Sequence, residues 1–187
     1  MAKPDYLDFI KTDIGALIDA LELPDLNKHF LRSRWLDQVL YTEKRAIQTQ
    51  KQYNTFRMMT IIGGVTIPAL VSLSVLGESA QRYLQYLTFA ISLIVAVSSA
   101  VEGFFRFGDR WRHYRETAEL QKIEGWQFFQ LSGPYRRFNK HVDAYHLFAS
   151  RVEEIIRRDV AVYVAQVTQE RKEQDKPEEG KEKDEAK

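Results

Sequence analysis

Two uncharged segments, MMTIIGGVTIPALVSLSVLG at residues 58–77 and YLQYLTFAISLIVAVSSAV at residues 83–101, decide the fold of this chain. As an α-helix each would span roughly 30 Å, which is about the thickness of the hydrocarbon core of a bilayer. Neither segment has a polar face wide enough for a helix exposed to water. We therefore predict transmembrane helices at 58–77 and 83–104, joined by an external loop at 78–82. A buried helical hairpin inside a soluble protein is the alternative, whereas a signal peptide would begin nearer the N-terminus and be shorter.

Basic residues flank the two segments on the side opposite the short loop. They are Lys44, Arg45, Lys51 and Arg57 before the first segment, and Arg106, Arg110, Arg112 and Arg115 after the second. The loop contains a single basic residue, Arg82. Because positive residues favour the cytoplasmic side, we expect an integral membrane protein with both termini in the cytoplasm.

The rest of the chain shows helical spacing and no competing strand pattern. Apolar residues at three- and four-residue steps predict an amphipathic helix within residues 1–24, which Pro24 ends. Its polar face is acidic, which favours packing on protein over lying on a membrane surface. The other expected segments are a helix at 25–57 leading into the membrane, a helix at 105–132 continuing out of it, a turn at 133–138, and a C-terminal helix at 139–169 with a seam of Val142, Tyr145, Ala149, Val152, Ile156, Val160, Tyr163 and Val167.

These segments predict an all-α membrane protein, a two-span transmembrane hairpin continuous with a cytoplasmic helical bundle. The composition of the 187 residues resembles an average soluble protein because opposite extremes cancel. Residues 170–187 contain 14 charged residues in 18 and are predicted to be a disordered tail.

The composition and motifs also exclude several classes of function. With a net charge of +1, nothing indicates binding to nucleic acid. The chain has no cysteine, which excludes a disulfide framework and a cysteine nucleophile. The four histidines have no metal-ligand spacing, and no phosphate-binding loop or hydrolase motif is present. We expect no metal, no cofactor and no enzymatic activity.

Polar residues gather on one side of the second span. The set comprises Gln85, Thr88, Ser92, Ser99 and Glu102, followed by Arg106. A surface that faces lipid should not collect polar groups, so this stripe should face protein or water. It could line a pore or form hydrogen bonds between packed helices, and both interpretations stay open. One hairpin cannot enclose a pore, so the first requires a homo-oligomer.

Two acidic residues are candidates for the charges at the mouths of such a pore. Glu102 lies at the cytoplasmic end of the second span, where a structural ion pair with Arg106 or Arg57 is the alternative. Glu78 is the one acidic residue of the external loop, and a solvated surface position is its alternative. Arg106 belongs to the same inner mouth.

Two further groups of residues are candidates for roles at the membrane. Gly63, Gly64 and Pro68 could form a hinge in the first span, or they could simply allow close helix packing. A basic and aromatic cluster just inside the membrane suits the headgroups of anionic lipids. The cluster comprises Arg110, Trp111, Arg112, Tyr114 and Arg115.

Spaced aromatic and charged residues over about 31–166 also resemble a known family. They are Arg34, Trp35, Gln38, Tyr41, Trp111, Tyr114, Arg115, Ala118, Glu119, Glu124, Gly133, Pro134, Tyr135, Phe148, Arg151, Val152, Glu153, Ile155 and Ile156. The pattern is similar to a bacterial two-transmembrane family of unknown function related to the SLATT group (SMODS and SLOG associating two-transmembrane effector domains). The resemblance implies a two-span helical protein that oligomerises and forms pores, with some relatives acting as membrane effectors in nucleotide-signalling defence.

The leading functional hypothesis is a homo-oligomeric membrane protein that forms a cation-permeable pore. Its expected partners are further copies of itself, the lipid bilayer and permeating ions. One rival is a non-conducting membrane scaffold or adaptor. Another is a signal-gated membrane effector of a bacterial defence system, although no nucleotide sensor is fused to this chain.

Overall fold

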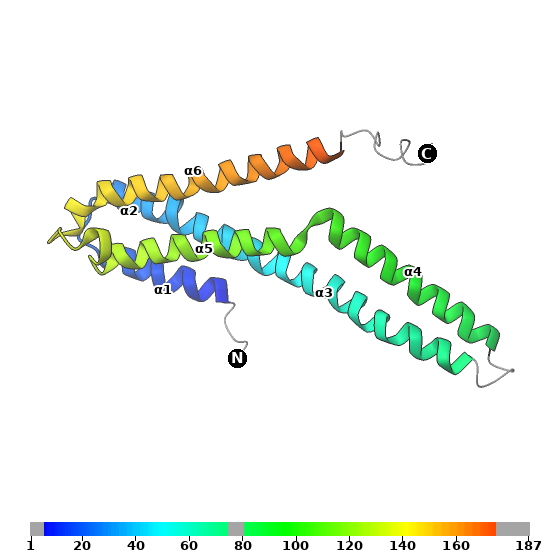
Figure 1. Ribbon diagram of the computed structural model, residues 1–187. Coiled ribbons are helices and arrows are strands. Elements are labelled where there is room, and N and C mark those ends of the chain that lie inside the picture. The colour runs from blue at the N-terminus through cyan, green and yellow to red at the C-terminus, as the bar shows by residue number, and fades with distance from the viewer. Residues whose placement is uncertain (1–5, 75–80, 175–187) are drawn as a thin grey trace. The chain divides into compact units, whose positions relative to one another are not determined.

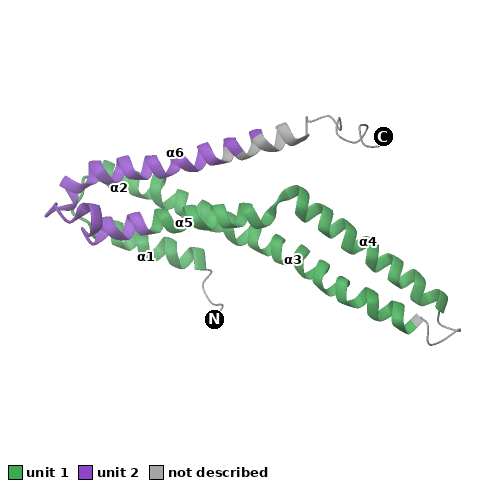
Figure 2. Ribbon diagram, viewed as in Figure 1, with its two compact units in different colours: residues 1–122 green, residues 123–187 purple. Residues whose placement is uncertain are grey.

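The computed structural model describes residues 6–74 and 81–174, which form helices joined by short turns (Figure 1). No strand occurs in these ranges, which confirms the predicted all-α fold class. The elements are α1 (Tyr6–Ala20), α2 (Asp25–Phe30), the π-helical turn η1 (Leu31–Leu36), α3 (Asp37–Ser74), α4 (Gln81–Phe105), α5 (Phe107–Phe129), the 3-10 turn η2 (Gly133–Tyr135) and α6 (His141–Gln174). The chain divides into two units, Met1–Lys122 and Ile123–Lys187 (Figure 2), which we describe separately.

In unit 1, the chain from Asp25 to Leu73 follows one continuous helical path. Helix α2 passes into η1 and then into α3 because the residues at the two junctions, Leu31 and Asp37, keep right-handed helical backbone angles. The predicted junction between a cytoplasmic helix and the first span therefore lies inside α3, which contains Pro68 without ending there.

Helices α3 and α4 lie side by side as a hairpin (Figure 1). At their contact Gly63 is buried, and a β-carbon added there would overlap Cγ2 of Val95. Nearby, the buried Ser98 places its hydroxyl oxygen 3.6 Å from Sδ of Met59. The missing side chain at Gly63 thus lets the two helices approach closely.

A backbone break separates α4 from α5, although the sequence predicted a helix continuing out of the second span. Arg106 has a φ of 47°, in the left-handed region that is costly for a residue with a β-carbon. Its guanidinium pairs with Asp109 in the first turn of α5, with Nη2 and Oδ2 3.0 Å apart. The ring of Phe107 stacks on Phe56 of α3, with centroids 5.6 Å apart. These contacts support the break, whose left-handed residue is an arginine and not the Gly or Asn that is usual at such a position.

Helix α1 packs against η1 and α3 through one apolar face. Ile10, Ile14 and Ile18 are buried, as the amphipathic pattern predicts. Tyr6 and Leu17, which share the same helical spacing, remain exposed. Packing on protein is therefore confirmed for the centre of this face.

Unit 2 is built around Phe128 near the end of α5. Its ring stacks on Phe148 of α6, with centroids 4.4 Å apart, and meets Tyr135 edge-on at 5.7 Å. The turn between the helices depends on Gly133, whose φ of +55° is one that residues with a β-carbon rarely adopt.

The buried face of α6 differs in part from the predicted seam. Ala144, Phe148, Val152 and Ile156 are buried. The prediction also placed Val142, Tyr145, Ala149 and Val160 on this face, and it was correct only at Val152 and Ile156 among the residues whose burial is described. Val142 and Val160 are exposed, and Tyr145 and Ala149 are half-buried. The aromatic stack on Phe128 decides the first half of this face, because it turns Phe148 rather than Ala149 inward.

Helix α6 extends to Gln174, so it includes the first residues of the segment 170–187 that was predicted to be disordered. Residues 175–187 lie outside the described residues, and so does Glu78 in the external loop.

Two glycine substitutions test the hairpin contact. Gly63→Ala should lower the free energy of unfolding of the purified protein by about 1–3 kcal/mol, because the added methyl group must displace the branched Val95 side chain. Gly64→Ala is the matched control, since nothing lies within 4 Å of a β-carbon there. It should leave stability unchanged or raise it slightly. Denaturation in detergent measures both, and equal destabilisation by the two variants would contradict the assignment.

Candidate functional site

The polar residues of α4 border the contact with α3. Thr88 and Ser92 are half-buried, and their hydroxyls donate to the carbonyls of Leu84 and Thr88, each at 2.8 Å. Gln85 and Ser99 are exposed. Because Gln85, Ser92 and Ser99 recur every seven residues, they follow one line along the helix. Within this line Gln85 and Ser99 are uncovered in the described chain, whereas Ser92 borders the contact with α3.

Glu102 is half-buried near the end of α4 and has no hydrogen bond or ion pair with any described residue. The alternative interpretation, an ion pair between Glu102 and Arg106, is not observed. Arg106 has a left-handed backbone, and its guanidinium donates to Asp109. Arg57 is exposed and does not pair with Glu102 either. The structure thus places an unpaired carboxylate at the end of an apolar helix.

The three hinge candidates of α3 have different surroundings. Gly63 is buried against Val95, whereas Gly64 faces open space. Pro68 has no backbone N–H, so the carbonyl of Gly64 lacks its usual helical donor. Gly63 is therefore a packing residue, and Gly64 with Pro68 forms one weakened turn.

The basic and aromatic cluster lies at the start of α5. Trp111 stacks on Tyr53 of α3, with ring centroids 6.3 Å apart and planes 8° from parallel. Gly108 is buried against the ring of Tyr53. A β-carbon added there would lie 3.0 Å from Cε2 of Tyr53. Arg112 is exposed, with Nη1 3.8 Å from Oδ1 of Asp109. The predicted headgroup residues are thus brought to one end of the hairpin by aromatic packing.

A buried ion-pair network, centred on Glu43 of α3, was missed by the sequence reasoning. The carboxylate of Glu43 is fully buried, and its Oε1 lies 2.7 Å from Nη1 of Arg115. Its Oε2 is 3.5 Å from Nζ of Lys122. Glu119 bridges the same two cations, at 3.1 Å from Arg115 and 2.9 Å from Lys122. Arg115, a predicted headgroup residue, is therefore engaged in holding α5 to α3.

Two neighbouring contacts join α5 to η1 and to α3. The indole N–H of Trp35 donates to the carbonyl of Gln121 at 3.1 Å. The side chain of Thr42 lies 3.1 Å from Oε1 of Gln121. The sequence of α5 does not show that Glu43 of α3 lies opposite Arg115, Glu119 and Lys122. This pairing depends on how the two helices pack.

The charges of this network shift the pKa of Lys122. Burial alone would lower the pKa of its ammonium, but the hydrogen bond to Glu119 and the charge of Glu43 raise the pKa above its ordinary value. A raised folded-state pKa contributes stability that is fully present below the unfolded value of about 10.5 and is lost as the pH rises through the folded value.

Unit 2 contains a second buried carboxylate, Glu124. Arg151 forms a bidentate ion pair with this carboxylate, in which Nε donates to Oε1 at 2.6 Å and Nη2 donates to Oε2 at 2.9 Å. The hydroxyl of Tyr135 also donates to Oε1. Burial and this hydrogen bond raise the pKa of Tyr135 well above its usual range, so the hydroxyl stays protonated and keeps donating. All three residues belong to the pattern on which the family resemblance rests.

The structure offers no group of three metal-ligating side chains among its described residues. His141 instead places Nε2 3.1 Å from the carbonyl of Phe129, and its ring packs edge-on against Phe128. The hydrogen bond and the ring contact of His141 therefore hold the start of α6 against the end of α5 within unit 2.

These features define the class of the protein. The described chain is all-helical, and two of its helices are long and apolar enough to cross a membrane, Asp25–Leu73 and Gln81–Phe105. Only 6% of the most apolar window of each helix is buried, which argues against a hairpin wrapped by the rest of the chain. The chain belongs to the family of proteins of unknown function DUF4231, whose match covers residues 37–143. No curated protein and no solved structure matches it.

Neutralising Glu43 tests the junction between α3 and α5. Glu43→Gln should lower the free energy of unfolding by about 1.5–3 kcal/mol, because it removes a buried charge on which two cations depend. Glu119→Gln makes the same change at a side chain that is 43% exposed and should cost less than about 1 kcal/mol. Chemical denaturation measures both, and a larger effect at Glu119 would contradict the central role of Glu43.

Proposed function

We propose that this protein is inserted in a bacterial membrane through α3 and α4, with both termini in the cytoplasm. The proposal is supported by the length and exposure of the two apolar helices. It is also supported by the basic residues at 44–57 and 106–115, against the single Arg82 beside the short loop. The aromatic pair Tyr53 and Trp111 suits the interface between hydrocarbon and water.

We further propose that copies of the chain assemble around a polar axis lined by α4. The observation that carries this step is the exposure of Gln85 and Ser99 on an apolar helix whose neighbour, α3, leaves them uncovered. Polar side chains inside a membrane face protein or water rather than lipid. A homo-oligomer would meet that requirement with the whole line of Gln85, Ser92 and Ser99.

In this arrangement the assembly conducts cations. Glu102, which has no partner among the described residues, would repeat around the axis as an acidic ring at the inner mouth. Glu78 would form the corresponding outer ring, and the helices outside the membrane would hold the assembly together. Arg106 pairs with Asp109, so it would not neutralise the inner ring. The protein is proposed to have no enzymatic activity.

Two alternatives follow from other uses of the same hairpin. A scaffold would bury the polar stripe of α4 in dry contacts between subunits, where each hydrogen bond contributes about 0.6–2 kcal/mol. A signal-gated effector would keep the stripe closed until a ligand binds outside the membrane. The resemblance of the sequence to the SLATT group, some members of which act as membrane effectors, supports this second alternative.

Ion flux through liposomes that contain the purified full-length protein tests the proposal. We expect potassium flux above that of empty liposomes, and a preference for potassium over chloride. Glu102→Gln should reduce this preference severalfold, because it removes the charge ring at the inner mouth.

The control is Glu116→Gln, the same change at an exposed carboxylate of α5. Absence of flux in a protein that is folded and oligomeric would contradict a constitutive pore and favour the scaffold. Flux with unchanged selectivity in Glu102→Gln would remove this residue from the conducting path.

A further inference from the structure

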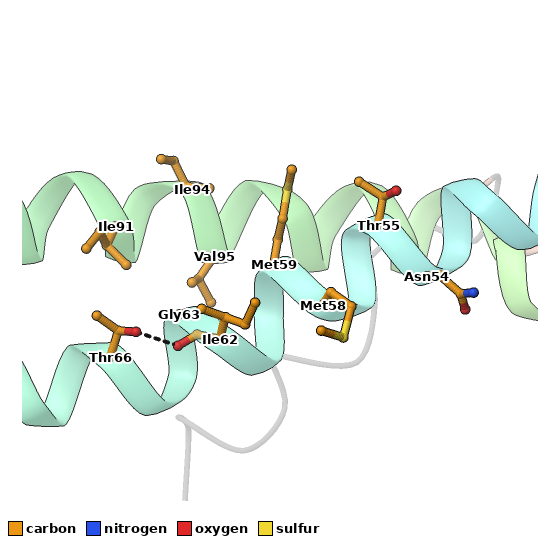
Figure 3. A pocket seen from close by; sticks show the side chains of 10 residues that line it. All are labelled: Asn54, Thr55, Met58, Met59, Ile62, Gly63, Thr66, Ile91, Ile94 and Val95. Atoms are coloured by element: carbon orange, nitrogen blue, oxygen red, sulfur yellow. Dashed lines mark hydrogen bonds between the residues drawn. The ribbon is translucent and has the colours of Figure 1, made fainter.

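A groove of about 700 Å³ runs along one side of the hairpin in unit 1 (Figure 3). Its middle is formed by Met58, Met59 and Ile62 of α3, facing Ile91 and Ile94 of α4. Two methionines suit an irregular and flexible apolar occupant, because their unbranched side chains adapt to its shape. Ile62 is 57% exposed, so the floor of the groove is open in the described chain.

One end of the groove is polar. Asn54 and Thr55 lie there, on the side where α3 leaves its uncharged segment (Figure 3). Thr55 donates its hydroxyl to the carbonyl of Lys51, whereas the amide of Asn54 has no partner among the described residues. A hydrogen-bond donor without a partner among the described residues therefore lies at the polar end of the apolar groove.

A basic side chain continues the same line. Lys51 precedes Thr55 by one turn, and Lys51, Thr55, Met58 and Ile62 follow at steps of four, three and four residues, which keeps them on one face of α3. The ammonium of Lys51 is exposed and has no ion pair with a described residue. At about 1.5 Å per residue, Asn54 and Lys51 lie roughly 6 and 10 Å from Met58 along the helix, which is the depth of lipid headgroups.

Around the polar end of the groove, the basic residues of α3 outnumber the acidic groups without a partner among the described residues, of which Glu102 of α4 is one. Between residues 44 and 57, α3 carries four basic residues and no acidic one. Glu43 is buried with Arg115 and Lys122. Asp109 pairs with Arg106. A second copy of the chain would bring the same excess of positive charge to this level, whereas the phosphate of a lipid would neutralise it.

We infer that this groove is a binding site for one anionic phospholipid, with an acyl chain along Met58, Ile62 and Ile94 and the phosphate at Lys51 and Asn54. The groove adjoins the polar stripe on α4, because Val95, which lines the groove, lies between Thr88 and Glu102 around the helix. Ile94, on the outer side of the groove, is about 140° from Ser99. The inference rests on the proposed insertion of the hairpin in a membrane, and not on the stripe lining a pore.

Photocrosslinking to a defined lipid tests the site. The full-length protein is reconstituted in phosphatidylcholine nanodiscs with phosphatidylglycerol that carries a photoreactive group on its acyl chain. We expect crosslinks at groove residues, mapped by mass spectrometry, and competition by unlabelled phosphatidylglycerol. Soluble glycerol phosphate at the same concentration should not compete, because it lacks the chain that fills the groove.

Two matched pairs of variants separate the headgroup from the acyl chain. Lys51→Gln should weaken the competition by phosphatidylglycerol about fivefold, the effect of one basic residue near an anionic surface. Arg57→Gln removes the same charge from the opposite side of α3 and should leave the groove unchanged. Ile62→Trp should abolish crosslinking by filling the groove, whereas Ile61→Trp, at a side chain that is 50% exposed beside it, should not.

Three results would overturn the inference. Crosslinks spread evenly around both helices would show unspecific lipid contact. Equal effects of Lys51→Gln and Arg57→Gln would show a general electrostatic attraction. Crosslinks between groove residues of two protein copies, in place of crosslinks to lipid, would show that a second hairpin occupies the groove.

Discussion

Helix α3 extends over 38 residues, and the other elements of unit 1 are positioned against it. One of its ends carries Glu43, which holds α5 through Arg115 and Lys122. About five turns further on, it carries Gly63, where α4 comes closest. Because a helix is stiff over this length, the ion-pair junction and the hairpin contact are fixed relative to each other. Both α4 and α5 are then constrained at the short link between them, and this link is where the chain adopts the left-handed backbone of Arg106.

The two buried carboxylates stabilise their units in the same physical way. Glu43 and Glu124 are buried carboxylates on helices, and each pairs with an arginine that is partly exposed, whereas Oε2 of Glu43 has no hydrogen-bond partner among the described residues. Burying a charge is costly unless it is paired, so removing either partner should be more damaging than removing an exposed ion pair. Such networks specify which faces of the helices meet, because a rotated helix would leave the carboxylate unpaired. The apolar hairpin has no comparable polar lock and relies on close packing at Gly63.

Much of the architecture was predictable from the sequence because it depends on properties of single segments. The described part of the first uncharged segment, 58–74, lies in α3, the second, 83–101, lies in α4, and Ile10, Ile14 and Ile18 form the buried face of α1. The stripe of Gln85, Ser92 and Ser99 follows from helical geometry alone. In contrast, the break at Arg106 and the inward turn of Phe148 depend on partners distant in the chain. Phe107 meets Phe56 and Phe148 meets Phe128, and neither pairing leaves a periodic signal.

The sequence by itself determined the helical class of the chain, the positions and apolar character of the two uncharged segments, and the distribution of charge around them. These quantities follow from composition and local spacing, because each helix satisfies its own backbone hydrogen bonds. Tertiary structure decided which of the polar residues are engaged and which are available. It placed Arg115 on Glu43, left Glu102 and Lys51 without partners among the described residues, and opened a groove beside Ile62. Those outcomes depend on how helices face one another, and a pair of side chains brought together by packing has no trace in local sequence.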